Sequence, residues 1–394
     1  MFRSNGLYAL TLAHSRDANM DAASEDVSGV ITGLFGSPDE PRWPVDLLAD
    51  PELRRRANDL LDMDRLRQAA GPQSSDQDDR HSGLYREHCV ICHGVGGDGA
   101  GPASRFQSPY PRDFRAGLFK WKSTPRSEKP TREDLHRVLQ NGLPGSPMPS
   151  FSTVAPEDRE ALVDYVIYLA VRGQVERELL AVAVDEFAYD GQRPSEAAWQ
   201  LRSIKPSDSK ELTEAQEAVV EVVEKVIGDW VSSSVKASPV PAIPGDEFWT
   251  EETTLAKGEA LFHGPVANCA GCHGKSGAGG VPLVDYDDWT KEFTTRIGVS
   301  PDDRDAVKPF RKAGALPPRQ VEPRRLAEAW PRGGGDPATL YRRIQHGISG
   351  TPMPGVMIDA ERQDSEPNGV GLSQDEALAL VAYVRQLMNH DRTL

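Results

Sequence analysis

The sequence predicts an all-α protein made of two similar helical modules joined by a helical linker. Three observations lead to this fold class. The same short sequence motifs recur in the same order in both halves, and each half ends in an amphipathic helical pattern. Between the halves, apolar residues recur at helical intervals. The 394 residues suffice for two or three domains, and 38% hydrophobic residues suffice for a packed core. We predict module 1 over residues 25–173, the linker over 174–245 and module 2 over 246–394.

Each module contains two shorter helical patterns before its last helix. The first pattern ends in Leu84-Tyr85 in module 1 and in Leu261-Phe262 in module 2. The second covers Arg132–Leu139 in module 1 and Pro337–Gln345 in module 2. The order of elements is therefore the same in both modules.

The last helix of each module has a recognisable start. Pro156 opens the helix predicted over Glu157–Val171, because proline is favoured in the first helical turn. Ser373 and Glu376 form a predicted capping box for the helix over Gln374–Met388. Both segments then show apolar residues at helical spacing.

The linker and the remaining segments carry no recognisable chemistry. Gln174–Phe187 and Thr213–Val235 are predicted helices, and the proline-rich Ser238–Pro244 is a predicted hinge into module 2. Residues 25–45 are expected to pack on module 1. Residues 285–322 read as an insertion in module 2 without a site.

All four cysteines fall into two identical motifs. These are Cys89-Val90-Ile91-Cys92-His93 and Cys269-Ala270-Gly271-Cys272-His273. A Cys-x-x-Cys-His run is the attachment site of c-type haem, in which both thiols bind the porphyrin and the histidine binds the iron. A four-cysteine zinc site would leave both histidines unexplained, a redox dithiol would need a strand–helix context, and disulfides across two residues would be strained. The sequence therefore predicts two covalently bound haem c groups.

A matching loop follows each motif and offers a second axial ligand. Residues 142–149 and 347–354 both read Gly-[Leu/Ile]-x-Gly-[Ser/Thr]-Pro-Met-Pro. The flanking prolines keep each methionine out of a helix, so that its thioether can reach an open iron face. We therefore predict iron ligation by His93 with Met148 and by His273 with Met353. Met357 is a rival without a counterpart in module 1, and His88 and His346 are rival ligands.

Three further residues are candidates for binding the haem propionates. Arg112 and Arg324 follow proline at matching points of the two modules, and Trp121 lies just beyond the first. Guanidinium groups pair well with carboxylates. The alternative is that both arginines are solvated surface residues.

With these motifs, the chain resembles the class I cytochrome c family. More narrowly, it is similar to bacterial di-haem cytochromes that carry Gly-Asp-Gly-x-Gly-Pro after the haem motif, here residues 97–102. The resemblance covers about residues 80–172 and 254–390. It implies that an N-terminal helix crosses the C-terminal helix in each module. His81 stands where Gly258 stands in module 2, so the crossing in module 1 is expected to differ.

The leading functional interpretation is an electron carrier. Two six-coordinate haems leave no open iron position, so the protein would transfer electrons between respiratory redox partners. The alternative is a di-haem enzyme of the cytochrome c peroxidase type, which needs one labile distal ligand and acid–base residues. A methionine loop in both halves argues against that alternative.

The net charge and the hydropathy of the sequence limit the classes of partner and the cellular compartment that we expect. The net charge of −15 argues against nucleic acid and suits redox partners with a basic docking surface. The sequence contains no apolar run long enough to span a membrane. Haem c is attached outside the cytoplasm, so we expect a periplasmic protein, although Arg3 and Gly6–Ala13 make only a weak leader.

Overall fold

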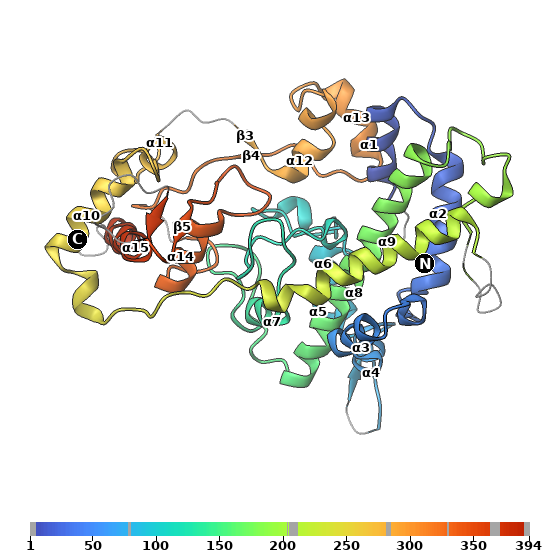
Figure 1. Ribbon diagram of the computed structural model, residues 1–394, viewed down its shortest axis with the longest axis horizontal. Helices are drawn as coiled ribbons and strands as arrows, with labels where there is room; N and C mark the ends of the chain where they lie inside the picture. Colours follow the sequence, from blue (N-terminus) through green and yellow to red (C-terminus); the bar gives the residue numbers. More distant parts are fainter. Residues whose placement is uncertain are drawn as a thin grey trace. The chain divides into compact units, whose positions relative to one another are not determined.

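A computed structural model describes residues 5–77, 80–202, 204, 212–280, 285–328, 331–362 and 371–389 (Figure 1). Arg3, named above as part of the weak leader, lies outside the described residues. Helices dominate, and the strands of the described part are two residues long and pair only in twos. The all-α prediction is confirmed. The strand pairs are β1 (Ser74–Ser75) with β2 (His81–Ser82), β3 (Asp285–Tyr286) with β4 (Gln320–Val321), both antiparallel, and β5 (Ile358–Asp359) with β6 (Leu372–Ser373), which is parallel.

The chain forms two compact units that each draw on both halves of the sequence. Unit 1 contains Met1–Phe119, Phe151–Val235 and Asp288–Pro318. Unit 2 contains Lys120–Ser150, Lys236–Asp287 and Arg319–Leu394. The segment with Met148 therefore belongs to unit 2, and most of the predicted insertion belongs to unit 1.

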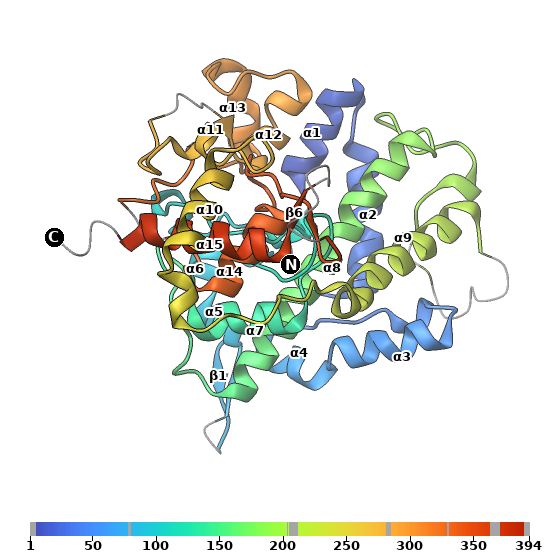
Figure 2. The same ribbon diagram turned by 60° about the vertical axis from the view of Figure 1, so that its left-hand side comes forward.

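Unit 1 is built around one long helix. Its α-helices are α1 (Gly6–Arg16), α2 (Asp21–Phe35), α3 (Pro51–Leu60), α4 (Met63–Ala69), α5 (Leu84–His88), α6 (Val90–His93), α8 (Pro156–Asp185), α9 (Glu214–Val231), α12 (Asp288–Glu292) and α13 (Arg304–Lys312). Short 3-10 helices are η1 (Val45–Leu47), η2 (Ser104–Phe106), η3 (Phe114–Ala116), η4 (Ala197–Trp199) and η8 (Thr295–Ile297). Helices α2, α4 and α9 pack around α8, as the two views show (Figures 1 and 2). Because α8 is covered on several sides, it buries apolar residues around most of its circumference.

Helix α8 continues through the predicted module boundary at residue 173. Pro156 stands in its first turn, as predicted, and the helix runs for 30 residues. Helix α9 begins at a capping box, in which the Thr213 hydroxyl accepts from Gln216 and the Gln216 side chain accepts from Thr213. The two predicted linker helices thus form, the first as the end of α8.

Helix α1 packs within unit 1 against α8 and the segment 288–318. The backbone N–H of Asn5 donates to Oε1 of Glu176 over 2.9 Å. The rings of His14 and Phe310 meet edge to face, with centroids 6.0 Å apart. Residues 6–13, read above as a weak leader, therefore belong to a packed helix.

Unit 2 is organised by a crossing of two helices. Its helices are α7 (Arg132–Asn141), α10 (Glu252–His263), α11 (Ala270–His273), α14 (Pro337–His346), α15 (Gln374–Asn389) and the 3-10 helix η7 (Asp246–Trp249), while η6 (Ser232–Lys236) joins the two units in sequence. Helices α10 and α15 cross at Gly258, where an added Cβ would lie 2.1 Å from the carbonyl oxygen of Ala379. The predicted capping box is confirmed: Ser373 Oγ accepts from Glu376 N over 3.0 Å, and Glu376 Oε2 accepts from Ser373 N over 2.9 Å.

The corresponding crossing in unit 1 differs, as the sequence predicts. His81 stands in β2 and is exposed, and α5 begins only at Leu84. Helix α5 therefore has no turn equivalent to the one that carries Gly258, and α4 packs on α8 beside it.

Candidate functional site

His93 lies at the end of a single helical turn and is held through its ring. Its Nδ1 is 3.0 Å from the carbonyl oxygen of Arg112. Since a carbonyl can only accept, Nδ1 carries the proton and Nε2 is left with a free lone pair. Burial lowers the pKa of His93 to about 4, which keeps the ring neutral. Phe114 stacks on the ring with centroids 4.5 Å apart.

His273 is held in the same way in unit 2. Its Nδ1 is 2.8 Å from the carbonyl oxygen of Arg324. Burial again lowers the pKa of the ring. The carbonyl oxygens of both histidines accept from a glycine six residues onward, at 2.9 Å from Gly99 and 2.8 Å from Gly279. Both histidines are thus oriented to offer Nε2 as a metal ligand.

A further pair of glycines allows the loop after each histidine to lie close to a long helix, α8 in unit 1 and α15 in unit 2. Gly97 and Gly277 have positive φ values of 72° and 71°. A Cβ on Gly97 would lie 3.1 Å from Leu169 of α8, and one on Gly277 would lie 3.0 Å from Leu387 of α15. A side chain at either glycine would be strained by the positive φ and crowded by the leucine, so glycine favours the close approach of both loops to their helices.

The four cysteine thiols are free; Cys89 is buried, and the other three are half-buried. Burial raises the pKa of Cys89 to about 12 and that of Cys269 to about 11, so both are protonated thiols in the unloaded chain. Gln107 Nε2 lies 2.9 Å from the sulfur of Cys92. Among the described residues, no three His, Cys, Asp or Glu side chains gather in a group that could hold a metal ion.

The two methionine loops, residues 142–149 and 347–354, have the same internal hydrogen bonds. Leu143 N donates to Met148 O over 3.1 Å, and Ile348 N donates to Met353 O over 3.3 Å. Each loop begins at a glycine with positive φ, 64° at Gly142 and 65° at Gly347.

A hydroxyl braces each methionine loop from within. Ser146 Oγ donates to Leu143 O over 2.7 Å, and Thr351 Oγ1 donates to Ile348 O over 2.8 Å. The same hydroxyls accept from the backbone N–H of Met148 and Met353, each over 3.3 Å. The loops are therefore preformed, and both methionines are half-buried.

The rival ligands lie in different surroundings. The side chain of Met357 is 60% exposed and stands outside such a loop. The ring of His88 packs edge to face on Phe151. Burial, with Lys122 and Arg342 nearby, lowers the pKa of His346 to about 4.

The structure gives the predicted arginines a role that sequence reasoning missed. The backbone carbonyls of Arg112 and Arg324, rather than their side chains, hold the two histidines. A proline precedes each arginine in the sequence, but 19 residues separate Arg112 from His93 and 51 separate Arg324 from His273, so spacing did not indicate the contact. Binding of propionates by the two side chains stays a prediction.

Trp121, the third predicted propionate residue, lies against an arginine that the sequence analysis did not single out. The guanidinium carbon of Arg343 is 4.6 Å from the Trp121 ring centroid. Arg343 is buried, and its Nη1 donates to Gly334 O over 2.8 Å, but its Nε and Nη2 have no hydrogen-bond partner among the described residues. Burial lowers its pKa to about 10. A buried cation with unused donors fits an anionic group such as a haem propionate.

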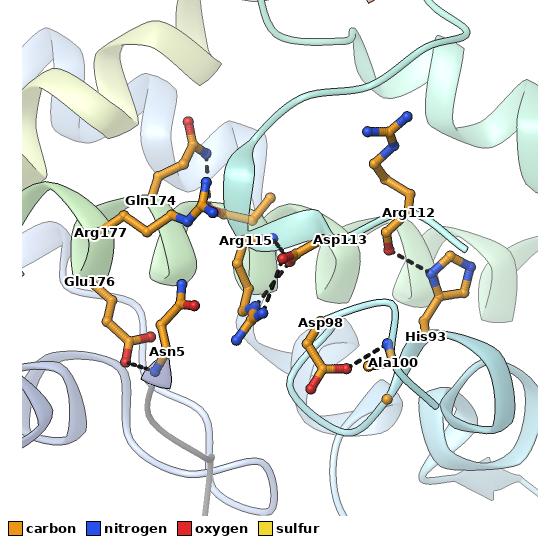
Figure 3. A network of polar contacts seen from close by, with 12 residues as sticks. Asn5, His93, Asp98, Ala100, Arg112, Asp113, Arg115, Gln174, Glu176 and Arg177 are labelled. Atoms are coloured by element: carbon orange, nitrogen blue, oxygen red, sulfur yellow. Dashed lines mark hydrogen bonds and ion pairs between the residues drawn. The ribbon is translucent and has the colours of Figure 1, made fainter. Parts of the chain in front are cut away.

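A buried ion pair lies beside His93 in unit 1 (Figure 3). Arg115 donates to both carboxylate oxygens of Asp113 over 3.0 Å. Burial disfavours the charge of Arg115, but Asp113 outweighs it and the pKa of Arg115 stays above its ordinary value. Gly173 of α8 lets this pair approach, since a Cβ there would lie 2.4 Å from Arg115 Cα. The pair fixes the segment that supplies the Arg112 carbonyl.

Comparison with known proteins identifies the class. Residues 76–166 match the family model described as cytochrome c oxidase, cbb3-type, subunit III, and residues 255–388 match the model described as cytochrome c. The chain therefore belongs to the class I c-type cytochromes, with two such domains, which implies covalently bound haem c and a role in electron transport. Its first domain is similar to subunit III of cbb3-type oxidases, and its second to cytochrome c itself.

No curated protein matches the chain significantly. A solved chain of the Kuenenia stuttgartiensis reducing HAO-like protein complex aligns with 21% identity and a TM-score of 0.46, covering 77% of this chain and 94% of that chain. No helix in the described part of the chain is long and apolar enough to cross a membrane.

Proposed function

We propose that the protein transfers electrons between respiratory redox partners through two haems with His/Met ligation. Cys89 and Cys92 would hold the first haem and Cys269 and Cys272 the second, with iron ligation by His93 with Met148 and by His273 with Met353. The observation that carries this proposal is that the same hydrogen bonds surround the histidine and the methionine in both halves of the chain. Both histidines donate through Nδ1 to an arginine carbonyl, and both methionine loops have the same internal bonds.

The chain's own residues would orient and insulate the redox centres. The haem, when bound, supplies a one-electron carrier. The carbonyls of Arg112 and Arg324 fix the histidine tautomer and raise the basicity of Nε2. The preformed loops would present each thioether without reorganisation, and thioether ligation raises the haem potential. Phe114 on the ring of His93 keeps water from that side of the ligand.

The partners follow from charge. With a net charge of −15, the protein suits redox partners that carry a basic docking surface. The match to a cbb3-type subunit supports membership in a respiratory assembly. We place the protein in the periplasm, where c-type haems are attached.

Haem content tests the proposal directly. Purified protein should contain two haems per chain in a pyridine haemochrome assay, and both should survive acid-acetone extraction. Cys272→Ala should weaken the covalent attachment of one haem, because a single thioether remains. A wild-type ratio near one would contradict the proposal. If the protein turned over hydrogen peroxide, the peroxidase interpretation would replace electron transfer.

We further propose that Arg343, on the face of Trp121, binds a haem propionate. Arg343→Leu should lower the potential of one haem, because the removed cation no longer disfavours the ferric state. Arg385→Leu is the matched control, since Arg385 also lies over a tryptophan, 4.9 Å from the Trp249 centroid. Redox titration measures both variants. Equal potentials in the Arg343 variant and the wild type would count against this role.

A further inference from the structure

An arginine of the first half of the sequence forms hydrogen bonds with the second methionine loop. Arg126 and the loop 347–354 both belong to unit 2. Arg126 Nη1 donates to Met353 O over 2.7 Å, and its Nη2 donates to Thr351 O over 2.6 Å. The planar guanidinium thus bridges two carbonyls of one loop, which a lysine ammonium cannot do in the same geometry.

The loop also donates a hydrogen bond to the backbone of Arg126. Ser349 Oγ donates to Arg126 O over 3.0 Å, and Ser349 is buried. Side chain and backbone of Arg126 therefore both bind the segment 349–353. We call this set of three hydrogen bonds the Arg126 clasp.

The segment that carries Arg126 is itself firmly held. The buried carboxylate of Asp134, at the start of α7, accepts from Ser123 N over 2.8 Å, Ser123 Oγ over 2.9 Å and Thr131 N over 3.2 Å. Thr124 Oγ1 donates to Lys129 O over 2.7 Å. Because this turn is braced on both sides, Arg126 is presented from a fixed base although its side chain is exposed.

The first methionine loop is in turn bound by a residue of the second half of the sequence. Pro144 O, in the loop 142–149, accepts from Gly333 N over 2.8 Å. Gly333 precedes α14 in the second half of the sequence, just as Arg126 precedes α7 in the first. Each methionine loop is therefore bound by the segment that leads into the other half's loop.

We propose that Arg126 is a positioning residue for Met353, so that a residue of the first half controls the axial thioether of the second haem. The inference rests on the proposed ligation by Met353. The clasp holds the carbonyl of Met353 itself, two bonds from its Cα, and so limits the loop opening that would withdraw the sulfur from the iron.

The test uses the full chain with both haems and compares Arg126→Lys with Arg126→Gln. Lysine keeps the charge and loses the fork, whereas glutamine loses both. Both variants should weaken the red-end absorption of thioether-ligated ferric haem for one haem. Loss of about one charge-assisted hydrogen bond should also raise the cyanide affinity of that haem roughly tenfold. The other haem should keep its spectrum and its cyanide affinity.

Two further variants sharpen the result. Ser349→Ala removes the returning bond and should shift the same signals in the same direction by less. Arg67→Gln is the control for loss of an exposed guanidinium, since Arg67 pairs with Asp64 in unit 1 and is 63% exposed. It should leave both haems unchanged.

The positioning role of Arg126 is refuted if Arg126→Lys behaves like the wild type while Arg126→Gln alone changes the absorption and the cyanide affinity, because charge would then explain the effect. Met353→Ala separates this failure from a failure of the proposed function. If Met353→Ala leaves the thioether absorption intact, the ligand assignment is wrong. If Met353→Ala removes it and the Arg126 variants do not, only the clasp is wrong.

Discussion

Met353→Ala should convert one of the two haems into a five-coordinate centre. The remaining histidine cannot replace the lost thioether, so that haem should turn high-spin, bind cyanide or carbon monoxide, and lose its red-end absorption. Axial ligands set haem potentials over about 0.8 V, and we expect a drop on the order of 0.1–0.2 V for that haem. Met148→Ala should do the same to the other haem. Visible spectroscopy with redox titration measures both effects.

The chain contains a matched control for this experiment. Met357 lies four residues beyond Met353, but its side chain is 60% exposed and outside the braced loop. Met357→Ala should leave both spectra and both potentials unchanged. If the substitutions at Met148 and Met353 changed nothing, other residues would be the distal ligands, and His88 and His346 would be the first to replace.

Gly258→Ala should strongly destabilise unit 2. The new methyl group would lie 2.1 Å from Ala379 O and 2.8 Å from Tyr383 Cβ, so α10 and α15 would have to move apart. A backbone carbonyl cannot rotate away as a flexible side chain can. We expect a net loss of about 3 kcal/mol, since the clash exceeds the gain in helix propensity. Thermal unfolding followed by circular dichroism measures it.

Gly228→Ala provides the comparison. Gly228 also stands inside a helix, α9, but no described residue outside that helix turn lies within 4 Å of its added Cβ. The same change there should be neutral or stabilise the protein by up to about 1 kcal/mol. Equal effects at the two positions would mean that the helix crossing does not depend on Gly258.

Local sequence patterns predicted the candidate haem-binding residues. The two Cys-x-x-Cys-His runs and the two proline-flanked methionines lie within a few residues each, so their spacing alone indicates their chemistry. The capping box of Ser373 and Glu376 is equally local, because its partners are three residues apart. His81 stands in module 1 at the position that corresponds to Gly258 in module 2. This difference predicted a different helix crossing in unit 1, because two helices approach most closely where one of them has a glycine.

The partners of the histidines could not be predicted from spacing. The carbonyl of Arg324 holds His273 although 51 residues separate them. Arg343 resembles an ordinary helix arginine in the sequence, and only tertiary packing places it on Trp121 and buries its Nε and Nη2 without a hydrogen-bond partner in the described part of the chain. Likewise, nothing local indicated that Asp113 and Arg115 would be buried together against Gly173.

The sequence by itself determined the all-α class, the repeated motifs and the candidate haem-binding residues, because these depend on patterns within one or two helical turns. Only the tertiary structure decided which segments share a unit: 120–150 joins the second methionine loop, and 288–318 joins α1 and α8. The Arg126 clasp joins residues 223 to 227 positions apart. Such pairings depend on the shape and burial of whole surfaces, which no local pattern of residues encodes.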